Sequence, residues 1–274
     1  MKRVFTSLAI ALLFFTVAQV TSDHANPLGN NSNDSFSKAK KIMQKEIYIV
    51  PQDMKTIYCG ADFNNQKYVV LPSGFSTEVY KKRVKRWEAE HVVPAENFGK
   101  EFSEWREGAA VCVDSKGKAF KGRKCAEKAN KEYRFMQSDL YNLYPAIGAV
   151  NAARQNYNFV MLPSTSSKNY RSFGSCDMII DKKDHDAQPP ERARGVIART
   201  YMYFEAVYPK YKMSKQQRQL MDAWDKQYPV TKWECERAKK IKKIQGNKNP
   251  ILDDRCKIER VFSVPSNLTA KLDH

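Results

Sequence analysis

Histidine is scarce in this chain of 274 residues, and the scarcity narrows the search for a catalytic base. The sequence contains four histidines, of which His24 lies in an asparagine-rich stretch and His274 is the last residue. His185 lies in the charged run DKKDHD, which is typical of a solvated loop. Only His91, in EHVVPA, precedes an apolar pair closed by a proline, a pattern that indicates a short strand ending at the proline. We therefore expect a folded core to hold His91 rigidly.

Apolar runs long enough to span a membrane are absent after the amino-terminal segment. The stretch from Leu8 to Val20 is nearly all apolar, follows Lys2 and Arg3, and precedes the small residues of AQVTSD. These features predict a signal peptide over residues 1–22, with an approximate cleavage point. No later stretch approaches the ~20 apolar residues that a membrane helix needs. We therefore expect an exported protein, periplasmic or extracellular, without a membrane partner.

Cysteines with CxxC spacing are also absent, which argues against a zinc site built from thiolates. Six cysteines in an exported chain instead favour three disulfides. Cys112 and Cys125 flank the loop VDSKGKAFKGRK and are the expected local pair. The other four cysteines can pair in several ways, which the sequence leaves open: Cys59, Cys176, Cys235 and Cys256.

Acidic residues are too few to balance the basic ones. The chain has 47 Lys and Arg against 30 Asp and Glu, a formal net charge of +17. Such a surface favours a polyanionic partner, either nucleic acid or an anionic membrane, although a basic surface can also serve solubility alone. No isolated basic amphipathic helix is evident, so a membrane-active protein is the least favoured class. Two basic stretches, KKRVKRW and the loop between the paired cysteines, supply candidate phosphate contacts: Arg83, Lys85, Arg86, Lys121 and Lys124.

The order of the expected elements indicates a mixed α+β fold, with strands and loops first and helices later. Residues 23–38 are expected to be a flexible polar leader. Residues 39–274 are expected to form one domain, because no linker-like segment interrupts residues 45–260. Apolar spacing near 3.6 residues predicts helices over 127–143, 193–208, 214–229 and 232–246, the third with Ser214 as its N-cap.

The pair Glu90–His91 suggests a catalytic chemistry. A well-placed histidine, a neighbouring carboxylate and downstream asparagines are the parts needed for metal-assisted hydrolysis of a phosphodiester. Hard cations such as Mg²⁺ prefer the oxygen ligands that Glu and Asn provide. Neighbouring side chains of a strand point to opposite faces, so both residues can reach one site only if the chain bends between them. A carboxylate that merely pairs with a nearby arginine such as Arg86 is the structural alternative for Glu90.

Several segments together resemble the endonuclease I family of periplasmic and extracellular non-specific nucleases, which belong to the His-Me finger (ββα-metal) class. The resemblance spans roughly Tyr58 to Cys256, with the motifs in the same order as in the family. Those motifs are EHVVPA, GKAFKGRKC, DLYNLYPAIGAVNAAR, PPERARGVIARTYMY and KQYPVTKWECER.

The resemblance implies a disulfide-stapled ββα-metal core with additional helices, and a role for four residues. His91 matches the general base, and Glu90 and Asn151 match the two protein ligands of one Mg²⁺, a site that Mn²⁺ or Ca²⁺ could also occupy. Arg123 matches the arginine that contacts the scissile or product phosphate. Asn142 is the competing metal ligand, and its alternative is a structural asparagine bonded to backbone.

The implied activity is Mg²⁺-dependent endonuclease cleavage of DNA and RNA without sequence specificity, leaving 5′-phosphate and 3′-hydroxyl ends. A monomer without an obligate protein partner is expected. The alternative is a non-catalytic exported nucleic-acid-binding protein on the same scaffold. Two positions depart from the family pattern: Tyr141 in YNL stands where many relatives have histidine, and Ala61 stands where relatives often have a second cysteine. One family disulfide is therefore expected to be missing.

Overall fold

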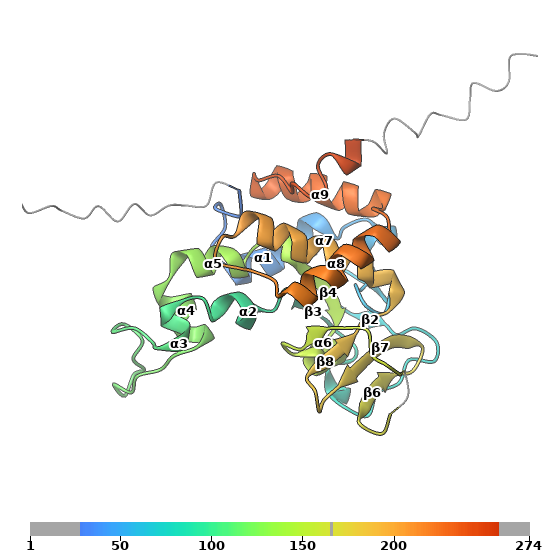
Figure 1. Cartoon of the computed structure of the whole chain (residues 1–274), viewed down its shortest axis with the longest axis horizontal. Helices are drawn as coiled ribbons and strands as arrows, with labels where there is room; N and C mark the ends of the chain where they lie inside the picture. Colours follow the sequence, from blue (N-terminus) through green and yellow to red (C-terminus); the bar gives the residue numbers. More distant parts are fainter. Residues whose placement is uncertain (1–27, 165–166, 258–274) are drawn as a thin grey trace, which may run out of the picture.

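The computed structural model describes residues 28–164 and 167–257 (Figure 1). The expected signal peptide, residues 1–22, and two of the four histidines lie outside the described residues. As predicted, the fold is mixed α+β. In Figure 1 helices α7 (Glu191–Val207), α8 (Lys215–Gln227) and α9 (Lys232–Gln245) gather in one part of the molecule, and the strands β6 (Tyr170–Phe173), β7 (Cys176–Asp181) and β8 (Asp186–Gln188) lie in another.

A two-stranded antiparallel sheet lies at the centre of the structure. It pairs β3 (Trp87–His91) with β4 (Leu143–Ile147), in a register that places Glu90 opposite Tyr144 and His91 opposite Leu143. Every residue of β4 is buried. The helix α6 (Gly148–Arg154) follows β4 directly. The chain therefore builds a strand, a second strand and a helix around the end of β3, although about fifty residues separate the two strands in sequence.

The remaining elements are short. The other sheets are β1 (Asp62–Phe63) with β2 (Val69–Val70), and a four-stranded sheet in the order β5 (Asn158–Phe159), β8, β7, β6. The remaining α-helices are α1 (Phe36–Ile42), α2 (Ala95–Gly99), α3 (Ser103–Arg106), α4 (Arg123–Ala129) and α5 (Lys131–Gln137). Single turns of other helix types are η1 (Met43–Ile47), η2 (Pro51–Asp53), η3 (Lys81–Arg83) and η4 (Leu140–Asn142).

The three helices predicted in the second half of the chain are confirmed as α7, α8 and α9. Ser214 caps α8 as predicted, because its side chain accepts a hydrogen bond from the backbone N–H of Gln217. Thr231 and Glu234 form a capping box at the start of α9, and Gly246 ends that helix in the left-handed conformation that glycine adopts without strain.

The prediction of one helix over residues 127–143 is wrong. The chain forms α4, then α5, then the single turn η4, and finally enters β4 at Leu143. The break lies at Asn130, which has an extended backbone and accepts a hydrogen bond from the N–H of Tyr133 through its side chain. Asp139 caps η4 in the same way. Side chains that bond to the backbone offer it an alternative to a continuous helix, and apolar spacing does not reveal this.

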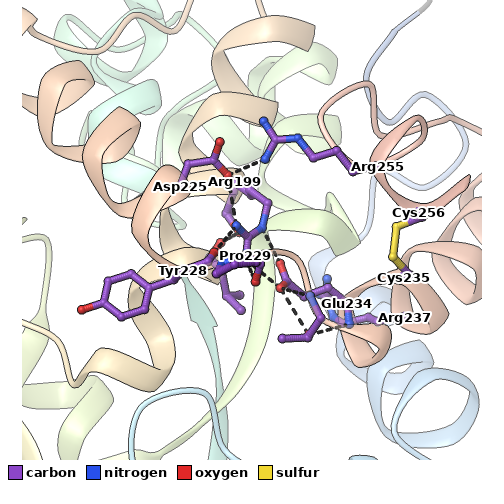
Figure 2. Close-up of polar contacts among 12 residues, drawn as sticks. Arg199, Asp225, Tyr228, Pro229, Glu234, Cys235, Arg237, Arg255 and Cys256 are labelled. Carbon is purple, nitrogen blue, oxygen red and sulfur yellow. Dashed lines mark hydrogen bonds and ion pairs between the residues drawn. A yellow bond between two sulfur atoms is a disulfide. The ribbon is translucent and has the colours of Figure 1, made fainter. Parts of the chain in front are cut away.

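Polar contacts join the three carboxyl-terminal helices (Figure 2). Arg199 of α7 donates to Asp225 of α8 at 3.0 Å and to Glu234 of α9 at 2.8 Å. Arg255 binds Asp225 at 2.5 Å. The disulfide Cys235–Cys256 lies beside this cluster and ties the following chain to α9. These contacts join α7, α8 and α9 to one another.

The expected flexible leader is wrong for residues 28–38. Asn30 and Asn33 are buried, and the Asn30 side chain donates to the carbonyl oxygens of Asn33 and Phe135. Ser35 then caps α1, which begins at Phe36. Polar composition suggested disorder, but here the side chain of Asn30 satisfies a backbone carbonyl of another segment.

The cysteines form three disulfides. The local pair Cys112–Cys125 is confirmed, and the open pairings are resolved as Cys59–Cys176 and Cys235–Cys256. Within the described ranges no cysteine is free. Of the helices in those ranges, none has the length and apolar content to cross a membrane.

Candidate active site

His91 is the last residue of β3, and its ring is held by one strong hydrogen bond. Its Nε2 lies 2.8 Å from the carbonyl oxygen of Gln137. A carbonyl oxygen can only accept, so Nε2 must carry the proton of the neutral imidazole. The Nδ1 atom then has a free lone pair. The backbone therefore selects the tautomer that can accept a proton at Nδ1.

The rings around His91 keep it neutral. Phe36 lies on it with ring centroids 4.9 Å apart, and Phe98 lies at 6.4 Å. Burial, and then the positive charge of Arg123, lower the pKa of His91 from 6.5 to about 3. An imidazole with such a low pKa is unprotonated at neutral pH and available as a proton acceptor.

Glu90 is buried beside His91 and has two partners that the sequence did not suggest. Its Oε1 accepts from the hydroxyl of Tyr58 at 2.6 Å and from Nη1 of Arg154 at 2.9 Å. The guanidinium of Arg154 also donates to the carbonyl oxygens of His91 and Val92. Arg154, rather than Arg86, is therefore the cation that pairs with Glu90.

Asn151 lies on α6, one helical turn before Arg154. Its Nδ2 donates to Glu88 at 2.9 Å, which leaves its Oδ1 free of hydrogen bonds from the described residues. The start of α6 must approach β3 closely for this contact. Gly148 allows the approach, because a Cβ at this position would lie 2.8 Å from the Glu88 side chain on β3 and 2.6 Å from the carbonyl oxygen of Arg83 on η3.

A cavity of about 370 Å³ collects the residues to which the sequence pointed. Glu90, His91, Arg123 and Asn151 all line it. Glu90 and His91 can both reach this cavity because β3 ends at His91. Arg154 holds the chain there by its hydrogen bonds to the carbonyl oxygens of His91 and Val92. Arg123 begins α4, and its guanidinium lies 5.3 Å from the ring centroid of Phe36. It forms no ion pair with a carboxylate of the described residues, so its charge is available to an anion.

The donors in this cavity suit a hard cation. Oε2 of Glu90 and Oδ1 of Asn151 accept no hydrogen bond from the described residues, and both belong to residues of the cavity wall. One carboxylate and one amide oxygen, with water and a phosphate completing the shell, is a donor set typical of Mg²⁺. Over the described ranges no group of three His, Cys, Asp or Glu side chains could hold a metal, so a zinc-like cluster is not found there.

Asn142 has a different environment. It is fully buried, its Oδ1 accepts from the N–H of Val93, and its Nδ2 donates to the carbonyl oxygen of Val93. These contacts match the structural alternative, in which an asparagine bonds to backbone. The neighbouring Tyr141, where relatives often have histidine, points its hydroxyl to the carbonyl oxygens of Ala238 and Asn247.

The candidate phosphate contacts divide into two groups. Arg83 and Arg86 line a second cavity, of about 420 Å³, which shares Phe36, Ala89 and Asn151 with the first. The other candidates line neither cavity: Lys85, Lys121 and Lys124.

Four residues of the site were not found from the sequence: Phe36, Tyr58, Gln137 and Arg154. Arg154 could have been predicted from the sequence, because it lies three residues after Asn151 and therefore on the same face of the helix. Phe36 lay in a stretch interpreted as disordered, and Gln137 acts through its backbone carbonyl, which any residue type could supply.

Comparison with known proteins identifies the family to which the chain belongs. The family model described as Endonuclease I matches residues 25–256. An extracellular deoxyribonuclease of Aeromonas hydrophila is 37% identical over 250 residues, which cover 89% of this chain and 98% of the relative. A periplasmic deoxyribonuclease of the same species is 35% identical over 262 residues, covering 93% and 100%. Endonuclease-1 of Buchnera aphidicola subsp. Acyrthosiphon pisum (strain APS) is 38% identical over 227 residues, covering 81% and 82%.

These similarities define the class of protein: an enzyme that hydrolyses phosphodiester bonds within a chain. The chain belongs to the endonuclease I family. The expectation of export is confirmed as well, since the relatives are extracellular or periplasmic and the three disulfides fit an oxidising compartment.

Proposed function

We propose that this endonuclease cleaves DNA, and also RNA, with one Mg²⁺ ion and without sequence specificity. One observation carries the proposal: His91, Glu90, Asn151 and Arg123 line the same cavity. The names of the relatives as deoxyribonucleases support DNA as a substrate. In this proposal β3, β4 and α6 form the ββα-metal core.

His91 acts as the general base. Its Nδ1 takes a proton from the water that attacks the scissile phosphorus, while the carbonyl of Gln137 holds Nε2–H in place. The bond between phosphorus and the 3′ oxygen breaks, which leaves a 5′-phosphate and a 3′ oxygen that takes a proton from solvent. The 2′-hydroxyl has no part in this reaction, so both DNA and RNA are suitable substrates.

Glu90 and Asn151 hold the metal through Oε2 and Oδ1. Bound there, Mg²⁺ supplies Lewis-acid stabilisation of the negative charge on the phosphate and the leaving oxygen, and Mn²⁺ or Ca²⁺ could occupy the same ligands. Arg123 adds a second positive charge to the phosphate. Lack of sequence specificity follows if the remaining contacts join cations to phosphates and not to bases.

The test is degradation of plasmid DNA and of RNA by the oxidised protein, with Mg²⁺ or with EDTA. We expect cleavage with Mg²⁺, none with EDTA, and none with His91→Ala, while His185→Ala, which does not line the cavity, cleaves normally. Ligation of the products confirms 5′-phosphate ends. If the wild type binds both nucleic acids but cleaves neither with Mg²⁺, the non-catalytic binding protein becomes the better interpretation.

A further inference from the structure

We propose that the second cavity, of about 420 Å³, binds the phosphate next to the scissile phosphate on the same strand, with Lys40, Lys67 and Arg86 as its cations. This inference rests on the proposed function, because it requires a nucleic-acid strand in the neighbouring cavity. Neither Lys40 nor Lys67 was among the phosphate contacts that the sequence predicted.

The two cavities are neighbours that share part of their walls. Phe36, Ala89 and Asn151 line both of them. Two cations lie over the ring of Phe36, with Arg123 at 5.3 Å and Lys40 at 4.8 Å from its centroid. A strand whose scissile phosphate contacts Arg123 can therefore place its next phosphate near Lys40 without leaving the surface.

The second cavity has an excess of positive charge that the protein does not compensate. Five cations line it, against the single carboxylate of Glu88: Lys40, Lys67, Lys82, Arg83 and Arg86. Glu88 is already bonded to Arg83 and to Asn151. The other four cations form no ion pair with any described carboxylate, whereas elsewhere Lys55 pairs with Asp62 and Lys240 with Asp53. Gathered like charges repel one another, and a bound anion relieves that repulsion.

The neighbouring positive charges affect the pKa of Lys67. Burial, and then the charges of Lys40 and Arg86, lower its pKa. Its backbone is left-handed, with φ of 69°, a conformation that glycine adopts more easily than lysine. The ammonium group lies 4.4 Å from the ring of Trp87, as that of Lys40 lies over Phe36, so aromatic rings orient both cations in place of carboxylates.

The cations also come from separate parts of the chain. Lys40 lies on α1, Lys67 on the turn between β1 and β2, and Arg86 just before β3. Only tertiary packing brings them together. A mixed set of lysine and arginine donors around a small polar cavity fits a phosphate, because ammonium and guanidinium groups both donate to its oxygens.

The experiment uses two oligothymidylates in which methylphosphonates replace all other linkages and remove their charge. One has a single phosphodiester, and the other has two adjacent phosphodiesters. We measure kcat/KM of the wild type with Mg²⁺ and the binding constants of His91→Ala for both. The wild type should prefer the doubly charged oligonucleotide by roughly tenfold, the value of one charge-assisted contact.

The double variant Lys40→Ala/Lys67→Ala should lose this preference, and Lys226→Ala, on an exposed part of α8, should retain it. A preference that persists in the double variant, or a loss that is equal for both oligonucleotides, would overturn the inference. If the wild type cleaves no nucleic acid, the proposed function fails, while the ratio of the two binding constants in His91→Ala still decides whether the second cavity holds a phosphate.

Discussion

Arg154 and Glu90 form an ion pair inside the protein, with 2.9 Å between Nη1 and Oε1. The Arg154 side chain is fully buried, and that of Glu90 is 3% exposed. The same guanidinium donates to the carbonyl oxygens of His91 and Val92 at 2.8 Å each. One residue of α6 therefore holds both the proposed metal ligand and the backbone that carries the proposed base. Burial raises the pKa of Glu90, and the charge of Arg154 opposes that rise.

Arg154→Met should reduce the free energy of unfolding by about 3–5 kcal/mol, because it leaves the carboxylate of Glu90 buried without a cation. Urea denaturation at neutral pH with EDTA measures the change. The double variant Arg154→Met/Glu90→Gln should recover part of the loss, since it removes the unpaired charge as well. A single variant as stable as the wild type would show that water or another group satisfies Glu90.

His91 should make stability depend on pH. Its pKa is about 3 in the folded protein and 6.5 when unperturbed, so the unfolded state binds more protons between these values. The free energy of unfolding therefore rises with pH across this window, and the contribution is lost as pH falls. Urea denaturation at several pH values should show a flatter dependence for His91→Gln than for the wild type. Equal slopes in the two proteins would contradict the low pKa.

Asn142 and Asn151 should respond differently to alanine. Asn142→Ala removes two buried hydrogen bonds to Val93 and should cost about 1–3 kcal/mol of stability. Asn151→Ala removes a proposed metal ligand and should raise the Mg²⁺ concentration needed for half-maximal activity, with a small effect on stability. Mg²⁺ titrations of both variants, beside urea denaturation, separate the roles. If Asn142→Ala raised the required Mg²⁺ concentration more than Asn151→Ala does, Asn142 would be the metal ligand and Asn151 the structural residue.

The disulfides Cys59–Cys176 and Cys112–Cys125 should contribute unequally to the free energy of unfolding. In the chain-entropy model, a long closed loop gives about 4–5 kcal/mol and a short one about 3 kcal/mol. Cys59 and Cys176 are 117 residues apart, and Cys112 and Cys125 are 13 apart. Replacing the first pair by serine should therefore reduce the unfolding free energy more than replacing the second. Thermal and urea denaturation of the two double variants give the comparison, and the reverse order would argue against an entropic origin.

Sequence patterns predicted correctly those elements whose structure depends on interactions between residues close in sequence. The helices α7, α8 and α9 follow from apolar spacing, and the cap at Ser214 follows from a side chain that reaches the adjacent backbone. The prediction of one helix over residues 127–143 was wrong for a reason that is also local. The side chains of Asn130 and Asp139 accept hydrogen bonds from nearby backbone N–H groups and divide the expected helix. Residues 28–38 were misjudged because burial of Asn30 depends on Phe135, which is remote in sequence.

Residue types at short spacing, and motifs in a fixed order, were enough to predict the candidate base, the local disulfide and the family. Three features became visible only in the folded protein: Arg154 pairs with Glu90, the Gln137 carbonyl selects the tautomer of His91, and Phe36 lines both cavities. These contacts link segments 46 to 64 residues apart, and burial makes them strong. Short-range patterns contain no information about which distant groups will share a desolvated site.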